Sequence, residues 1–154
     1  MNNQPDLFEL IIFNERKNIL FHYDLVNDKE SDEMKIQILE KLPRIQNLCG
    51  LVAALKELNK KFSPFATQNV KFFKSSFYKF SLYDSPGGIK IILLSSNNDF
   101  DYSDILEEIF LSAYIDLVQR NPLYQANTII KNTAFTSKIK SIFQNQQSVQ
   151  YKSN

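Results

Sequence analysis

The sequence is poor in the residues that build reactive centres. Among 154 residues it has one cysteine, one histidine, three glycines and no tryptophan. The single Cys49 excludes an internal disulfide and a cysteine metal cluster, and the single His22 excludes histidine metal clusters and a pair of relay histidines. No Walker or Rossmann glycine spacing is present. We therefore expect no catalytic residue, no metal and no cofactor.

The sequence also lacks an excess of charge of one sign, and it lacks long apolar runs. The chain has 18 basic and 17 acidic residues, a net charge of +1, whereas a general nucleic-acid binder needs a basic patch to neutralise phosphates. No apolar run approaches the roughly 20 residues that span a bilayer, and the polar start does not resemble a signal peptide. We expect a cytoplasmic protein that binds no nucleic acid and meets membranes only through partners.

Residues 77–94 predict two strands around a tight turn, and the rest of the chain is organised around them. The first strand alternates, with Tyr78 and Phe80 on one face and Lys79 on the other. Ser-Pro-Gly-Gly at 85–88 is typical of a turn. Residues 89–94 are apolar on both faces, which predicts a central strand that is covered on both faces. Residues 7–13 share this property apart from Glu9.

The remaining elements follow from periodicity and from start and stop signals. Before the hairpin we expect a return strand over 19–23, a charged loop over 24–33, a short turn or helix over 33–42, a main helix over 43–62 and an edge strand over 70–74. After it we expect one helix capped by Ser103 or Asp104 and ended by Pro122, and a last helix capped by Thr133.

The predicted fold class is α/β. A five-stranded, mainly antiparallel sheet in the order ββαβββαα carries the first helix on one face and the last two on the other. We expect one domain over residues 7–143, between a polar extension at 1–6 and a polar, disordered tail at 144–154.

Two stretches are candidate partner interfaces. Small residues on the main helix, Cys49, Gly50, Ala53 and Ala54, allow the close approach of another backbone; the alternative is tight packing on the chain's own sheet. Val70, Phe72 and Phe73 make an apolar edge strand, which invites a partner unless the chain's own loop at 63–69 covers it. We interpret His22 as a packed strand residue and the Cys49 thiol as buried.

Several pieces in order give the chain a family resemblance. They are Phe21-His22-Tyr23; Gly50 and Ser63-Pro64 near the end of the first helix; Tyr78-Lys79 and Tyr83; Pro86 with Gly88-Ile89-Lys90; and Ser112-Ala113-Tyr114 with Leu117-Val118 before Asn121-Pro122-Leu123. Over residues 7–143 the chain resembles the small longin-fold subunit 1 family of the transport protein particle (TRAPP) complex. It departs from that pattern near Pro43 and in its polar ends.

The resemblance implies a longin-like (profilin-like) sandwich and a scaffold role in a tethering complex of ER-to-Golgi vesicle transport. Such subunits pair with a second longin subunit and with α/β-plait type subunits. The assembled core acts as a guanine-nucleotide exchange factor for an early-secretory Rab GTPase, by favouring the nucleotide-free GTPase. The resemblance also implies peripheral association with the cis-Golgi and the endoplasmic reticulum through the complex.

Two other classes of protein compete with this interpretation. A small longin-type adaptor subunit of a vesicle coat would bind cargo signals in an apolar slot. A small-molecule sensor domain of similar layout would need an internal pocket with polar groups. A longin SNARE is disfavoured, because no heptad helix or membrane anchor follows the domain in this sequence.

Overall fold

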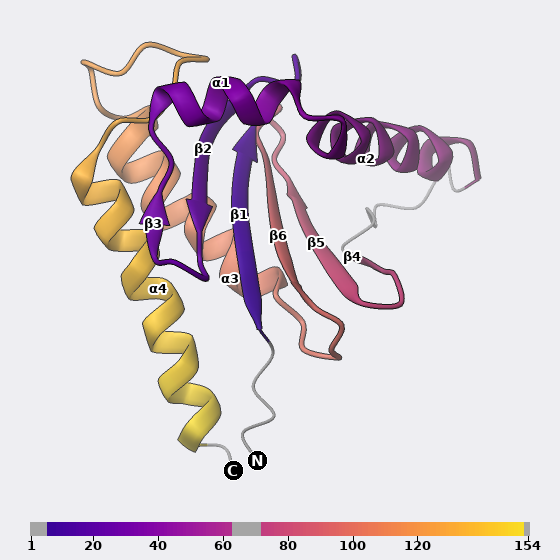
Figure 1. Ribbon diagram of the computed structural model, residues 1–154. Coiled ribbons are helices and arrows are strands. Elements are labelled where there is room, and N and C mark those ends of the chain that lie inside the picture. Colours follow the sequence, from indigo (N-terminus) through magenta and orange to yellow (C-terminus); the bar gives the residue numbers. More distant parts are fainter. Residues whose placement is uncertain (1–5, 63–71, 153–154) are drawn as a thin grey trace. The chain divides into compact units, whose positions relative to one another are not determined.

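The computed structural model describes residues 6–62 and 72–152, which form two compact units. The first unit ends at Phe100 and contains an antiparallel sheet with helices α1 and α2 (Figure 1). The second begins at Asp101 and consists of the helices α3, η1 and α4. The fold is thus mixed α/β, as the periodicities predict.

The sheet has six strands in the order β3-β2-β1-β6-β5-β4, and every neighbouring pair is antiparallel. The strands are β1 (Leu7–Phe13), β2 (Ile19–Asp24), β3 (Lys29–Glu30), β4 (Phe72–Lys74), β5 (Tyr78–Asp84) and β6 (Lys90–Ser96). The two strands that lack a polar face, β1 and β6, pair at the centre, with Ile11 opposite Ile92. The sequence predicts this central pair and the edge position of β4 correctly.

The prediction of five strands is wrong, because β3 adds a sixth. Lys29 and Glu30 pair with Asp24 and Tyr23 on β2, within residues that we expected to form a charged loop. The Asp24 carboxylate accepts the Val26 N–H at 3.0 Å and shapes the turn between β2 and β3. Two charged residues carry no alternation, so the sequence gives no signal for this strand.

Two helices follow β3, so the observed order is three strands, two helices, three strands and then the helical unit. Helix α1 (Glu33–Lys41) begins after Asp32, whose side chain accepts the Lys35 N–H at 2.8 Å. Helix α2 (Pro43–Phe62) begins at its proline, where the missing N–H costs nothing. The predicted break between a short helix and a main helix at Pro43 is confirmed. The predicted order ββαβββαα counts one helix at this place, whereas the structure has two.

The β5–β6 hairpin closes through the predicted turn. Gly88 has a φ of +86°, and its N–H donates to the Ser85 carbonyl at 3.2 Å. The Ser85 hydroxyl also accepts the Ile89 N–H. Register places Phe80 opposite Leu94 as the alternation requires, but the other face of β5 is not polar surface, because Lys79 is buried.

The second unit consists of α3 (Ser103–Glu108), η1 (Ile109–Gln119) and α4 (Thr133–Lys152). Segment η1 is a π-helix, as in the bond from the Arg120 N–H to the Ile115 carbonyl. The predicted apolar stripe of α4 is buried: Phe135, Ile139, Ile142 and Phe143. Helix α4 continues past residue 144, where we expected a tail to begin.

The predicted caps of this unit are displaced by one or more residues. Asn132, not Thr133, caps α4: its side-chain oxygen accepts the Ala134 N–H at 3.0 Å, and its amide donates to the Leu117 carbonyl. At the start of α3 the Asp101 carboxylate accepts the Ser103 N–H. Asn132 therefore takes the capping role that we assigned to Thr133, whereas the residue at the cap position of α3, Tyr102, makes no side-chain capping bond.

Substitution of Gly88 tests the turn. Gly88→Ala should lower the free energy of unfolding by about 1–2 kcal/mol, because a residue with a Cβ is strained at this positive φ. The nearest atoms to an added Cβ belong to the flexible side chain of Glu15, so backbone strain dominates. Gly87→Ala is the matched control, since a Cβ there meets nothing within 4 Å. Equal urea midpoints for the two variants would contradict the argument.

Candidate functional site

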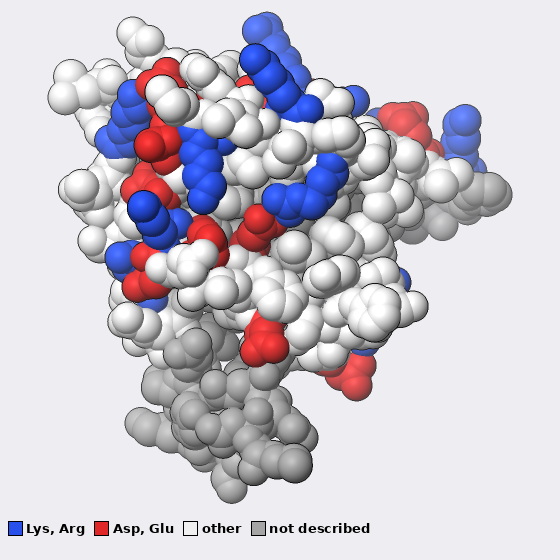
Figure 2. Space-filling model, viewed as in Figure 1, with Lys and Arg blue, Asp and Glu red and all other residues white. Residues whose placement is uncertain are grey.

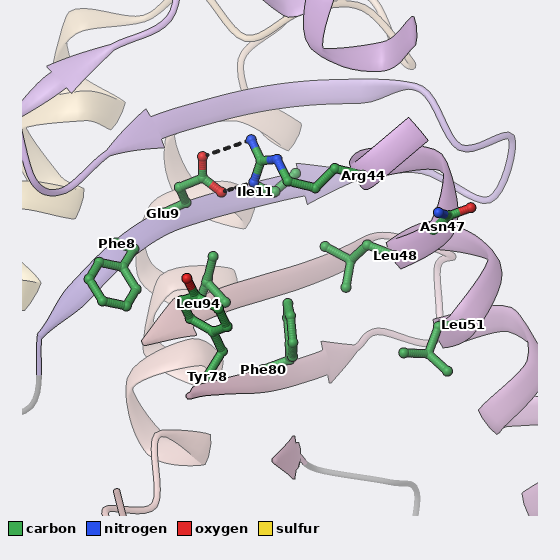
Figure 3. Close-up of a pocket in the computed structure, with 10 residues that line it drawn as sticks. All are labelled: Phe8, Glu9, Ile11, Arg44, Asn47, Leu48, Leu51, Tyr78, Phe80 and Leu94. Carbon is green, nitrogen blue, oxygen red and sulfur yellow. Dashed lines mark hydrogen bonds and ion pairs between the residues drawn. The ribbon is translucent and has the colours of Figure 1, made fainter. Parts of the chain in front are cut away.

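A groove lies between helix α2 and one face of the sheet (Figure 3). It has a volume of about 590 Å³, within the range of about 300–1,000 Å³ that is usual for ligand sites. The lining side chains come from β1, α2, β5 and β6: Phe8, Glu9, Ile11, Arg44, Asn47, Leu48, Leu51, Tyr78, Phe80 and Leu94. Most are apolar, so the groove offers hydrophobic surface in the first unit.

The polar end of the groove is built around Glu9. Arg44 on α2 donates two hydrogen bonds to its carboxylate, at 2.8 and 3.2 Å, and His22 Nε2 lies 3.4 Å from the same group. Burial raises the pKa of Glu9, but the hydrogen bonds from His22 and Arg44 outweigh it and lower the pKa to about 2. Glu9 is therefore ionised at neutral pH and fixes the first turn of α2 to β1.

His22 is a buried, hydrogen-bonded strand residue, as predicted. Its Nδ1 lies 2.6 Å from the hydroxyl of Ser31, and its Nε2 faces Glu9. Both ring nitrogens thus have partners in the structure, and the chain from Ser31 through His22 and Glu9 reaches Arg44. This network supports the end of the groove.

Aromatic rings line the sheet side of the groove, with Phe8 next to Glu9 on β1 (Figure 3). Phe8 and Tyr78 meet edge to face with their centroids 6.0 Å apart. Phe80 on the groove floor stacks on Phe73 of β4, with centroids 4.6 Å apart and planes inclined by 16°. The edge strand and the groove are therefore joined by one aromatic pair.

The structure places two of the predicted edge residues on β4, the terminal strand of the described sheet. Phe72 is 47% exposed, whereas Phe73 is half-buried in the stack with Phe80. The ammonium group of the buried Lys79 lies 4.8 Å from the centre of the Phe72 ring and donates to the Phe100 carbonyl. Val70 lies outside the described residues.

The predicted small residues of α2 do not share one environment. Cys49 is buried, and this burial raises the pKa of its thiol. Gly50 is half-buried with open space at its Cβ position, while Ala53 and Ala54 are exposed. The outward side of the helix thus keeps room for the close approach of another backbone at Gly50, Ala53 and Ala54.

Sequence reasoning missed the groove. Glu9 is the one polar interruption of an otherwise apolar β1, and such an interruption in a central strand is a signal for a paired, buried carboxylate. Its partner Arg44 lies 35 residues away, and nothing in the sequence pairs the two. The burial of Lys79 was not predicted either, because the partners of its ammonium group come from tertiary contacts.

Charges of both signs are interspersed on the face seen in Figure 2, and the described residues gather into no large patch of one sign there. Within residues 6–62 and 72–152 no group of three or more His, Cys, Asp and Glu could hold a metal ion. None of the described helices is both long and apolar enough to cross a membrane.

These features define a class: a mixed α/β protein with an antiparallel sheet, consistent with the longin fold. Within the described residues its two marked surfaces are the apolar edge strand β4 and the apolar groove. A model of the Sybindin-like family matches residues 7–146, and the chain belongs to this family. The match spans both compact units.

Curated relatives agree with this assignment. The chain is 26% identical to trafficking protein particle complex subunit 1 of Dictyostelium discoideum over 136 residues, which cover 86% of this chain and 91% of the relative. The proteins of the same name from Bos taurus and Homo sapiens are each 24% identical over 128 residues, 82% of this chain and 85% of theirs. The predicted resemblance to the subunit 1 family is confirmed.

The two hydrogen bonds from Arg44 to the Glu9 carboxylate form a clamp. Removal of this Glu9 clamp should change the stability of the protein in acid. Because the pKa of Glu9 falls from its ordinary 4.5 to about 2 on folding, its contribution is complete above pH 4.5 and is lost as the pH falls towards 2. Arg44→Met should cost about 1–2 kcal/mol of unfolding free energy at pH 7 and flatten the decline over this range.

Arg120→Met is the matched control, because its pair with Asp116 is exposed on a helix and should contribute less than about 0.5 kcal/mol. Denaturant titrations from pH 2.5 to pH 7 measure both effects. An Arg44→Met curve parallel to that of the wild type would contradict the role of the clamp.

Proposed function

We propose that this protein is a scaffold subunit of the trafficking protein particle complex and acts in vesicle transport between the endoplasmic reticulum and the Golgi. The similarity to subunit 1 of this complex over more than four fifths of both chains carries the proposal. The described surfaces support it, because they offer apolar contact area rather than a cluster of reactive groups.

The partners in this proposal are a second longin subunit, α/β-plait type subunits and, through the assembled core, an early-secretory Rab GTPase. Exchange on such a GTPase needs no covalent step. A complex that binds the nucleotide-free GTPase more tightly than the GDP-bound form shifts the population and accelerates GDP release. The chain contributes part of that platform, and its membrane association at the cis-Golgi and endoplasmic reticulum is indirect.

The edge strand β4 is the proposed contact with a neighbouring subunit. Its backbone pairs with β5 on one side within the described sheet, so its other side offers N–H and C=O groups to an added strand. The exposed Phe72 supplies apolar area beside these groups. Gly50, Ala53 and Ala54 on α2 offer a second surface, where small side chains permit close packing.

The edge contact is tested by Phe72→Asp. The substitution removes the apolar ring and places a carboxylate in an apolar contact, so the variant should recover at least about tenfold less of the other complex subunits in a tagged pull-down from its native cells. Val26→Asp is the matched control: Val26 is 65% exposed and lies near the opposite edge of the sheet. Thermal melts must show that both variants fold. Unchanged recovery with Phe72→Asp would refute this interface.

The scaffold role is tested with the reconstituted core. A core assembled without this chain should lose most of its exchange activity on its Rab, measured as release of fluorescent GDP, and addition of the chain should restore it. The chain alone should accelerate release no more than buffer does. Normal exchange by a core that lacks the chain would overturn the proposal.

A further inference from the structure

The helix side of the groove presents one face of α2. Arg44, Asn47, Leu48 and Leu51 are spaced i, i+3, i+4 and i+7, so their side chains form a single stripe. The stripe starts polar and becomes apolar along the helix. Opposite it, the sheet contributes Phe80 and Leu94, which are only half-buried. Among the described residues, the apolar floor therefore remains accessible to a further apolar group (Figure 3).

The polar end of the groove presents a cation. The side chain of Arg44 is 53% exposed, whereas that of Glu9 is 18% exposed. Glu9 takes two of the five guanidinium N–H donors, and the other three have no partner within the described part of the chain. Arg44 pairs with the Glu9 carboxylate and His22 Nε2 lies 3.4 Å from it, so the carboxylate oxygens are already occupied. An arriving group meets spare Arg44 donors, which favour a carboxylate.

Asn47 adds a second kind of recognition on the helix side of the groove. Its side-chain amide is exposed and has no hydrogen-bond partner among the described residues, so both its donor and its acceptor are available. A donor and an acceptor on one planar group match the N–H and C=O of a peptide backbone. An acyl chain would fill the apolar floor but would leave this amide without a partner.

We propose that the groove binds a short peptide segment of a partner protein, with apolar side chains on the floor and an Asp or Glu at Arg44. Each part of the ligand answers a feature of the site: leucine or phenylalanine side chains meet Leu48, Leu51 and Phe80, the carboxylate meets Arg44, and the main chain meets Asn47. The site lies on the inner side of α2. It is distinct from the β4 edge and from Ala53 and Ala54, so it goes beyond the proposed scaffold role.

The test starts from the full chain and a random display library of peptides of about twelve residues. Selected peptides should combine Leu, Ile or Phe with Asp or Glu. Fluorescence anisotropy of one selected peptide, labelled with a dye, should give a saturable binding curve. Leu51→Lys should weaken binding about tenfold or more, because it places a charge over the apolar floor. Arg44→Met should weaken binding of the acidic peptide more than binding of its Asn or Gln counterpart.

Leu58→Lys is the matched control. Leu58 is 49% exposed and Leu51 is 40% exposed on the same helix, but Leu58 does not line the groove. Its variant should bind like the wild type. Enrichment of basic peptides, equal affinity of Leu51→Lys and the wild type, or a chain that selects no peptide yet binds palmitate in the groove would each overturn the proposal. The peptide-binding assay contains no other subunit of the complex. A negative result in this assay therefore contradicts the peptide groove and leaves the proposed scaffold role unaffected.

Discussion

The pairing of β1 with β6 is the contact on which the first unit depends. It joins residues about eighty positions apart in the chain, and both strands carry apolar side chains on both faces. Such strands are stable only in the middle of a sheet, so this pair fixes the order of the others: β2 and β3 extend from β1, and β5 and β4 extend from β6. The register also sets Glu9 opposite Leu94 and so places a carboxylate beside an apolar floor.

The clamp on Glu9 follows from that placement. A carboxylate in a central strand loses hydration, and the loss is offset only where donors converge on it. His22 comes from the neighbouring strand, whereas Arg44 comes from the first turn of α2, directly after Pro43, the residue at which this helix begins. The same ion pair therefore compensates the buried charge and sets where α2 begins over the sheet.

Local signals predicted the parts of the fold that depend on local chemistry. The two-faced apolar strands, the turn at Gly88, the helix start at Pro43 and the edge position of β4 all follow from periodicity or backbone restriction. The sequence could not predict β3, because two charged residues have no period, nor the groove, whose walls are brought together from four elements. The burial of Lys79 depends on tertiary contacts with the Phe72 ring and the Phe100 carbonyl, which override its place in an alternating strand.

The edge strand and the groove share one physical element, the stacked rings of Phe73 and Phe80. Strand β4 has three residues, so its order depends largely on its bonds to β5 and on this stack. A partner strand on its open side would add backbone hydrogen bonds and hold Phe73 more firmly. Phe80 would then be held as well, and with it the floor of the groove. A ligand on Phe80 would stabilise the same stack, so if both proposed partners bind, each should strengthen the binding of the other by the same factor.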